Sequence, residues 1–212
     1  MKKNKDFWNK YYLKNKKLTI PSPSSFASFF YKKFLKKNDS IIEIGCGNGR
    51  DTFHFYKKTK KIIAIDQSKS AINKNIKLSK KLLKKINFVN CDFEKINKNY
   101  KKNIDFLYAR FFLHTINLRQ ENVLIKQINS IKANCNIKIV LEFRTSKDKL
   151  KDKGKVLSKN TSFTDHYRRF INVDNFLKKL KKNNFKVIYI KQGINLSKTK
   201  NDNPHLCRLV FE

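Results

Sequence analysis

The sequence predicts an α/β fold with a seven-stranded, mostly parallel sheet. Seven short apolar runs of strand length occur along the chain, and amphipathic segments of helix length separate most of them. Strands that alternate with helices pair in parallel through right-handed crossovers. The last two runs lie about a dozen residues apart with no helical pattern between them, so the final strand can return antiparallel. We therefore expect helices on both faces of the sheet and a reversed last strand.

The expected elements follow one another along the whole chain. Strands are expected near residues 40–45, 61–66, 86–90, 104–109, 136–143, 185–191 and 205–211. Helices are expected near residues 50–58, 69–84, 118–132 and 173–183. The lysine-rich stretch 146–160 reads as one long irregular loop after the fifth strand. A chain of 212 residues is within the size of one domain, so we expect a single domain, residues 1–212, with a helical lid segment at 1–38 and a core at 39–212.

The N-terminal segment is basic and aromatic. Its first expected helix carries aromatic residues at helical spacing: Phe7, Trp8, Tyr11 and Tyr12. A second expected helix follows a proline-containing break, with Ser24 or Ser25 able to cap it. This second helix bears four phenylalanines: Phe26, Phe29, Phe30 and Phe34. An apolar stripe of this kind more often packs against a core or forms a lid than stacks on nucleic-acid bases.

The first expected strand runs into three glycines at alternate positions. These are Gly45, Gly47 and Gly49, and Glu43 stands two positions before the first of them. The second expected strand ends in Asp66. A Rossmann-like sheet holds an adenosine-containing cofactor with such a turn and such a carboxylate, which accepts from the ribose hydroxyls. Three glycines alone could be a simple turn, but the two acidic residues favour a cofactor, and the absence of G-x-G-x-x-G favours one without a pyrophosphate.

This pattern resembles motif I of the class I S-adenosylmethionine-dependent methyltransferases. The resemblance implies S-adenosylmethionine as the cofactor, with these binding residues: Glu43, Gly45, Cys46, Gly47, Gly49, Asp66, Gln67, Asp92, Phe93 and Arg110. Asp92 and Phe93 follow the third expected strand and are similar to the family's adenine motif. In that motif the carboxylate accepts from the exocyclic amine and the next residue covers the ring. A helix cap is the alternative role for Asp92.

The residues after the fourth expected strand bear on the acceptor. The Asn/Asp-Pro-Pro-Tyr/Phe sequence of amino-methylating DNA enzymes does not occur there, and neither does a cysteine suited to pyrimidine C5 methylation. Instead the strand ends in Arg110, and His114 follows. A histidine, with a pKa of about 6.5 in peptides, can take a proton from a hydroxyl while the methyl group leaves sulfur. A purely structural histidine is the alternative.

A second polar group follows the fifth expected strand. Arg144 ends that strand, and the run Asp165-His166-Tyr167-Arg168-Arg169 comes after the long loop. We expect an acceptor pocket formed by Tyr12, Arg144, Tyr167, Arg168 and Arg169. Arginines grip carboxylates or phosphates with two hydrogen bonds, and His166 is an alternative base. A cluster of ion pairs at the start of a helix is the competing interpretation.

Several segments together are similar to one branch of the family. With the glycine motif, FWNKYY, YARFFLHTI, LEFR and DHYRRF resemble small bacterial methyltransferases associated with surface-polysaccharide biosynthesis, including capsule phosphoramidate modification. The resemblance implies methyl transfer to oxygen of a small anionic, phosphorylated or sugar acceptor, without a metal. It also implies that the N-terminal segment closes over the cofactor, with Tyr11 or Tyr12 near the sulfonium.

The net charge of +34 makes nucleic acid, RNA above all, the alternative partner. Only seven of the 50 basic residues are arginine, and the lysines are spread over the expected helices. Solvated helix faces therefore explain much of the charge. A non-catalytic scaffold is a third interpretation, but the intact glycines speak against it.

The remaining features predict a cytoplasmic protein. The four cysteines lie far apart, with no C-x-x-C pair and no zinc spacing: Cys46, Cys91, Cys135 and Cys207. No apolar run has the length of a membrane helix, and the N-terminus lacks an apolar signal core. The sequence does not indicate an oligomeric state.

Overall fold

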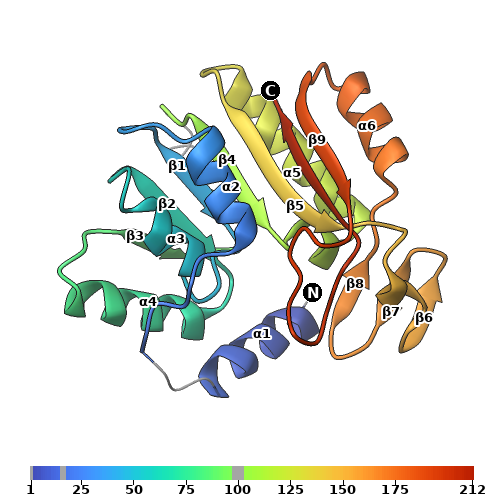
Figure 1. Ribbon diagram of the computed structural model, residues 1–212, viewed down its shortest axis with the longest axis horizontal. Coiled ribbons are helices and arrows are strands. Elements are labelled where there is room, and N and C mark those ends of the chain that lie inside the picture. The colour runs from blue at the N-terminus through green and yellow to red at the C-terminus, as the bar shows by residue number, and fades with distance from the viewer. Residues whose placement is uncertain (1, 15–17, 97–102) are drawn as a thin grey trace. The chain divides into compact units, whose positions relative to one another are not determined.

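The computed structural model describes residues 2–14, 18–96 and 103–212 (Figure 1). By its internal contacts the chain divides into two compact units, Met1–Tyr108 and Ala109–Glu212. Each unit has its own buried apolar residues and its own polar network, so each is described in turn. Among the helices within the described ranges, none is both long and apolar enough to cross a membrane.

Among its described residues, the first unit contains four strands. Its elements are α1 (Lys2–Lys14), α2 (Ser25–Lys33), β1 (Ile41–Ile44), α3 (Arg50–Phe55), β2 (Ile62–Asp66), α4 (Lys69–Lys81), β3 (Asn87–Asn90), η1 (Phe93–Lys95) and β4 (Phe106–Arg110), whose last two residues belong to the second unit. β1 pairs in parallel with β2 and with β4, and β2 pairs in parallel with β3. Ser68 caps α4 by accepting the Ala71 N–H at 3.2 Å. The expected strands and helices of this part of the chain are confirmed.

Helix α2 belongs to the core of the first unit. Phe26 and Phe30 are fully buried, and their rings lie 5.1 and 5.4 Å from the ring of Tyr108 on β4. The Tyr108 hydroxyl donates to Asp51 Oδ2 at 2.9 Å. Asp51 also accepts the N–H and the hydroxyl of Ser24, the N-cap of α2, both at 2.8 Å. The second half of the expected lid segment is therefore packed as core.

The second unit contains the reversed strand. Its elements are η3 (Leu113–Thr115), α5 (Leu118–Lys132), β5 (Lys138–Arg144), η4 (Lys149–Asp152), β6 (Lys155–Ser158), β7 (Thr161–Phe163), β8 (Tyr167–Arg169), α6 (Val173–Lys182), β9 (Val187–Gly193) and β10 (Leu206–Phe211). β10 runs antiparallel to both of its neighbours, β5 and β9. The strand order of the seven-stranded sheet is β3-β2-β1-β4-β5-β10-β9. This confirms the mostly parallel sheet with a reversed last strand.

The expectation of one irregular loop at 146–160 is wrong. This stretch contains η4 and β6, and β6 joins β7 and β8 in a separate three-stranded sheet, visible in orange tones in Figure 1. Both strand pairs of this sheet are antiparallel. All four residues of β6 are exposed. A strand without a buried face shows no alternation of apolar and polar residues, so the pattern that reveals other strands is missing here.

Candidate functional site

The glycine loop, residues 45–49, is pinned to the end of β2. The backbone N–H groups of Gly45 and Cys46 both donate to the Ile65 carbonyl, at 2.8 and 3.1 Å. The Gly49 N–H donates to the Cys46 carbonyl at 2.9 Å and closes the turn. The Cys46 side chain is buried in an apolar cluster, so this residue offers only its backbone to the loop surface. The loop thus takes a defined shape at the carboxyl end of the strands.

Three side chains lie against Gly47. Its N–H donates to Asp66 Oδ2 at 2.8 Å, and its carbonyl accepts from Asn75 Nδ2 at 2.8 Å. Its φ of +53° is in the left-handed region, and a methyl group here would collide with the Tyr12 hydroxyl. Asn75, on α4, was not predicted from the sequence, since a buried asparagine in a lysine-rich helix carries no motif. The backbone of Gly47 is therefore fixed by side chains from β2 and α4.

Asp66 lies where the sequence predicts, at the end of β2. Its second oxygen, Oδ1, accepts the Ser68 N–H at 2.8 Å. Burial raises the pKa of Asp66, while the N–H groups of Ser68 and Gly47 lower it. Each carboxylate oxygen has a further lone pair, so Asp66 can accept from two ribose hydroxyls while it keeps both backbone bonds. Gln67 follows it directly, in the turn before α4.

Glu43 lies in β1, two residues before the glycine loop. It is buried in β1 and accepts the Thr52 hydroxyl of α3 at 2.5 Å. Burial and the nearby Asp51 raise the pKa of Glu43 well above its ordinary range. The side chain therefore connects β1 to the helix that starts directly after the loop.

The two residues expected to bind adenine, Asp92 and Phe93, lie at the start of η1. Asp92 caps η1 by accepting the Glu94 N–H at 3.1 Å, which is the alternative role considered for it. Phe93 is buried, with 5% of its surface exposed. The cap uses one carboxylate oxygen of Asp92, so an amine can still bind to the other.

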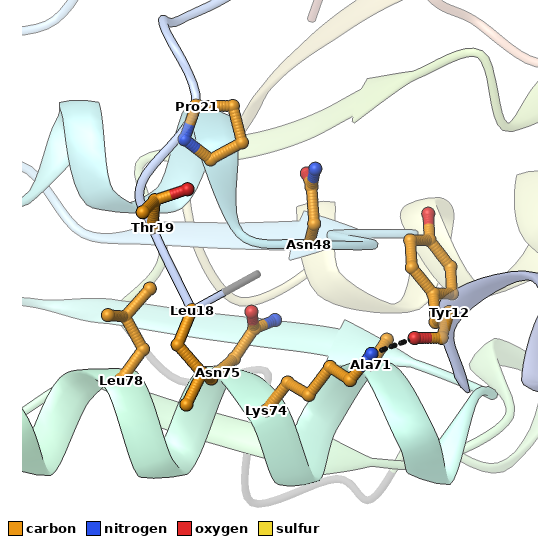
Figure 2. A pocket seen from close by; sticks show the side chains of 9 residues that line it. All are labelled: Tyr12, Leu18, Thr19, Pro21, Asn48, Ala71, Lys74, Asn75 and Leu78. Carbon is orange, nitrogen blue, oxygen red and sulfur yellow. Dashed lines mark hydrogen bonds between the residues drawn. The ribbon is translucent and has the colours of Figure 1, made fainter. Parts of the chain in front are cut away.

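Helix α1 covers the glycine loop. The Tyr12 ring lies over Gly47, and Lys74 of α4 donates to the Tyr12 carbonyl (Figure 2). Asn9 Oδ1 accepts the Ser68 hydroxyl at 3.0 Å. Burial, followed by the charge of Asp66, raises the pKa of Tyr12 well above 10.0, so the phenol keeps its proton. Tyr12 was expected among acceptor residues, and the structure places it at the glycine loop.

A pocket opens beside the loop in the first unit. Figure 2 shows its walls, which are formed by the end of α1, the segment 18–21 and α4. Its lining combines apolar and amide side chains: Tyr12, Leu18, Thr19, Pro21, Asn48, Ala71, Lys74, Asn75 and Leu78.

A buried carboxylate in the second unit binds two arginines. Glu142 of β5 is fully buried and accepts from Arg110 Nε at 2.9 Å and from Arg208 Nε at 2.7 Å. The Ser197 hydroxyl donates to the same carboxylate at 3.0 Å. Arg110, predicted to bind the cofactor, is thus part of a buried ion pair. Sequence reasoning missed Arg208, although opposite charges inside two neighbouring apolar strands are a signal for such a pair.

The other predicted arginines also have internal partners. Arg144 is buried and bonds to Asp148 at 2.8 Å and to Asp202. Arg168 bonds to Asp165 at 2.6 Å and to the Thr164 hydroxyl.

Arg169 is engaged in the same way, through two different nitrogens. Its Nε donates to the Ile116 carbonyl at 3.0 Å, and its Nη2 bonds to Glu121 at 2.5 Å. Tyr167 lies beside Arg168 on β8 and is half-buried. The ion pairs of the competing interpretation are therefore present in this cluster. They also orient the guanidinium groups that an acceptor would meet.

His114 stands at the centre of these charges. It is buried, and burial lowers its pKa well below 6.5. The charges of Arg144, Arg168, His166 and Arg110 lower it further, in that order. The structure thus brings these predicted residues into one electrostatic neighbourhood.

The hydrogen bonding of His114 limits its chemistry. Its Nδ1 accepts the Arg144 backbone N–H at 3.3 Å. The neutral ring therefore carries its proton on Nε2 and can donate from there. Taking a proton on Nδ1 would break the bond to Arg144.

His166 has the opposite arrangement. It is buried, and its Nδ1 lies 3.0 Å from Asp165 Oδ1. A carboxylate beside Nδ1 favours the proton on that atom and leaves the lone pair on Nε2. Burial, then the charge of Arg168, lower the pKa of His166 to about 4, although Asp165 opposes both. The ring is therefore neutral at physiological pH.

The protein should lose stability as the pH falls from about 6.5 toward 4. All four histidines have a lowered pKa, with burial as the largest cause: His54, His114, His166 and His205. Between the folded and unfolded pKa values the unfolded chain binds more protons, so the free energy of unfolding rises with pH. His166, with a pKa of about 4 against an ordinary 6.5, should contribute about 3 kcal/mol over this window. Urea unfolding at several pH values would measure the slope.

The variant His166→Gln should flatten that slope, because glutamine does not titrate. His205→Gln is a matched control at a less buried histidine and should change the slope less. Equal slopes in wild type and His166→Gln would show that His166 is protonated equally in the folded and unfolded chain.

Comparison with known proteins identifies related sequences. A family model described as "Methyltransferase domain" matches residues 35–201. The chain is 31% identical over 94 residues to a probable S-adenosylmethionine-dependent methyltransferase of Saccharomyces cerevisiae, covering 43% of this chain and 31% of that protein. It is 34% identical over 92 residues to a probable cobalt-precorrin-6B C(15)-methyltransferase (decarboxylating) of Methanobrevibacter smithii, covering 41% of this chain and 46% of that protein. The chain thus spans less than half the length of either relative.

Solved structures share the fold. An S-adenosylmethionine-dependent methyltransferase from Anabaena variabilis superposes with a TM-score of 0.71 at 17% identity, covering 100% of this chain and 93% of that one. Magnesium protoporphyrin IX methyltransferase from Synechocystis, solved with bound SAM, superposes with a TM-score of 0.61 at 12% identity, covering 88% of this chain and 76% of that one. At these identities the likeness concerns the fold alone.

Proposed function

This chain belongs to the family of methyltransferase domains, and on that premise we propose that it transfers a methyl group from S-adenosylmethionine to a small acceptor. The observation that carries the proposal is the cradle at Gly47. The Gly47 N–H donates to the Asp66 carboxylate at the end of β2, and the Gly47 carbonyl accepts from the Asn75 side chain. Such a loop brings backbone close to a ligand and leaves a carboxylate beside it for sugar hydroxyls.

The residues present fit this cofactor. The glycine loop would face the methionine part, Asp66 and Gln67 the ribose, and Asp92 with Phe93 the adenine. Glu43 joins the two elements that flank the loop, β1 and α3, by accepting the Thr52 hydroxyl. When bound, the cofactor supplies a methyl group on a positively charged sulfur. The neutral thioether that remains after transfer is a good leaving group. The protein's contribution is to orient the acceptor and to take up its proton.

For the acceptor we propose a small anionic, phosphorylated or sugar compound that is methylated on oxygen, in the biosynthesis of a surface glycan. The support is the pair of oriented arginines that act on His114 in the second unit, Arg144 and Arg168, with Arg169 oriented by Glu121 next to Arg168 on β8, together with the resemblance noted above. Arg144, Arg168 and Arg169 would recognise the anionic group. His166, with its lone pair on Nε2, suits proton uptake, and His114 suits donation from Nε2.

RNA is the second candidate acceptor, because the chain carries a net charge of +34. It predicts binding that weakens steeply as salt rises. A small-molecule acceptor predicts a much shallower dependence on salt, so binding measured at several salt concentrations separates the two.

Titration of the purified protein with S-adenosylmethionine tests the first half of the proposal. We expect saturable binding in the micromolar range, as is usual for enzyme ligands. Transfer of labelled methyl to a panel of phosphorylated sugars, carboxylated sugars and RNA then tests the second half. The absence of binding at millimolar cofactor would contradict the proposal as a whole.

The variants Arg168→Lys and Arg169→Lys should keep cofactor affinity and weaken acceptor affinity or turnover. Lysine retains the charge but loses the planar group that forms paired hydrogen bonds, so a loss of roughly tenfold is expected. Arg119→Lys is a matched control at an exposed arginine of α5 that is not among the residues proposed to bind the acceptor. Steady-state kinetics with the identified acceptor would measure KM and kcat for each variant.

His114→Ala should lower turnover more than it lowers cofactor affinity. Loss of an oriented proton donor or acceptor typically costs about 100-fold or more. If this variant and both arginine variants behave like wild type, the second unit's charged cluster is structural.

A further inference from the structure

We infer that Tyr12 and the methyl donor compete for the space beside Gly47, so that helix α1 must move before the cofactor binds. This inference rests on the proposed role of the glycine loop. It adds a conformational step that controls the access of the cofactor to that site.

The competition follows from the geometry at Gly47. Even a methyl group on Gly47 would collide with the Tyr12 hydroxyl. The position where a ligand would approach the loop backbone is therefore filled by this side chain. The charge of Asp66 acts on the phenol, and Asp66 also accepts the Gly47 N–H, so the hydroxyl lies close to the residues proposed to bind ribose and methionine. A cofactor that reaches Gly47 and Asp66 must displace the ring.

Polar contacts of helix α1 run to α4 and to the residue that caps it. Lys74 donates to the carbonyls of Tyr12 and Leu13, and Asn9 accepts from Ser68. Tyr11 and Leu13 are 54% and 61% exposed. An isolated helix of 13 residues is marginally stable in water, so its position depends on these contacts.

Helix α2, by contrast, is anchored in the core. Phe26 and Phe30 are fully buried, and Ser24 is bonded twice to Asp51. Arg50 adds two bonds from its side chain to the Ser22 carbonyl, at 2.9 and 2.5 Å. Helix α1 can therefore be displaced while α2 keeps its packing in the core of the first unit.

The chain contains its own reporter for this movement. Trp8 is the only tryptophan in the sequence, and it lies on α1. Its ring is stacked near the Tyr12 ring, with centroids 6.1 Å apart and planes at 29°. Displacement of Tyr12 should change the surroundings of the indole and hence its emission.

The experiment measures Trp8 emission and cofactor affinity together. S-Adenosylhomocysteine is titrated into wild type, Tyr12→Ala and Lys74→Met, with Tyr11→Ala as a matched control at an exposed tyrosine of the same helix. In wild type, saturation should shift the Trp8 emission. Tyr12→Ala and Lys74→Met should bind faster and more tightly, by about tenfold if the covering arrangement is populated about 90% of the time. Tyr11→Ala should bind like wild type.

Two results would overturn the inference. One is weaker binding in Tyr12→Ala, which would make Tyr12 a contact to the cofactor and not a competitor. The other is a Trp8 emission that stays unchanged at saturation in wild type. Lys74→Met acts on the attachment of α1 without altering the loop, so it gives an answer even if Tyr12→Ala folds poorly. Failure of every variant to bind would instead contradict the proposed function.

Discussion

Replacing Glu142 with alanine should lower the free energy of unfolding by about 3–5 kcal/mol. The carboxylate is fully buried and accepts from both Arg110 and Arg208. Its removal leaves two guanidinium groups in a region of low polarity without their counter-charge. The penalty is large because a buried unpaired charge costs more than the pair itself contributes.

Urea unfolding monitored by circular dichroism would measure this change. Glu212→Ala is the matched control, since the side chains of Glu212 and Lys138 are 42% and 40% exposed and their charged atoms lie 3.9 Å apart. An exposed ion pair of this kind contributes at most about 1 kcal/mol. A loss below about 1 kcal/mol in Glu142→Ala would mean that water or a rearranged side chain satisfies the two arginines.

Replacing Asp66 with alanine should weaken S-adenosylmethionine binding by about 1.5–3 kcal/mol, or roughly 10- to 150-fold. Two effects combine in this variant. The proposed bonds from ribose hydroxyls are lost, and the N–H groups of Gly47 and Ser68 lose the acceptor that orients them. The loop is then free to relax away from the shape that fits the ligand.

Isothermal titration calorimetry would measure the affinity of each variant. Asp105→Ala is the matched control. Asp105 also accepts a backbone N–H, that of Ser40 at 2.8 Å, but it lies just before the first residue of β4, at the opposite end of the strands from the glycine loop. It should lose stability and keep cofactor affinity. Equal affinities in wild type and Asp66→Ala would show that the cofactor does not bind at this loop.

The sequence by itself determined most of the strand and helix pattern, the glycine turn and the place of Asp66 at the end of β2, because these depend on local signals, whereas the contact of Asn75 with Gly47 spans 28 residues and appears only in the tertiary structure. A glycine with positive φ, a serine before a helix and an apolar run act on their own neighbours in the chain. Ser68 caps α4 three residues ahead, and Asp66 binds the N–H two residues ahead. Such features can be read without knowing the fold. The three-stranded sheet escaped detection because β6 buries no face.

Only the tertiary structure decided what the arginines do. Glu142 lies 32 residues from Arg110 and 66 from Arg208 along the chain, and Arg169 lies 48 from Glu121. A sequence shows that a charged group is present, but its partner is chosen by strand register and helix packing. The same holds for Tyr12, whose position over Gly47 depends on how α1 rests against α4. Charge and ring contacts act through space, so their partners appear only once distant segments are brought together.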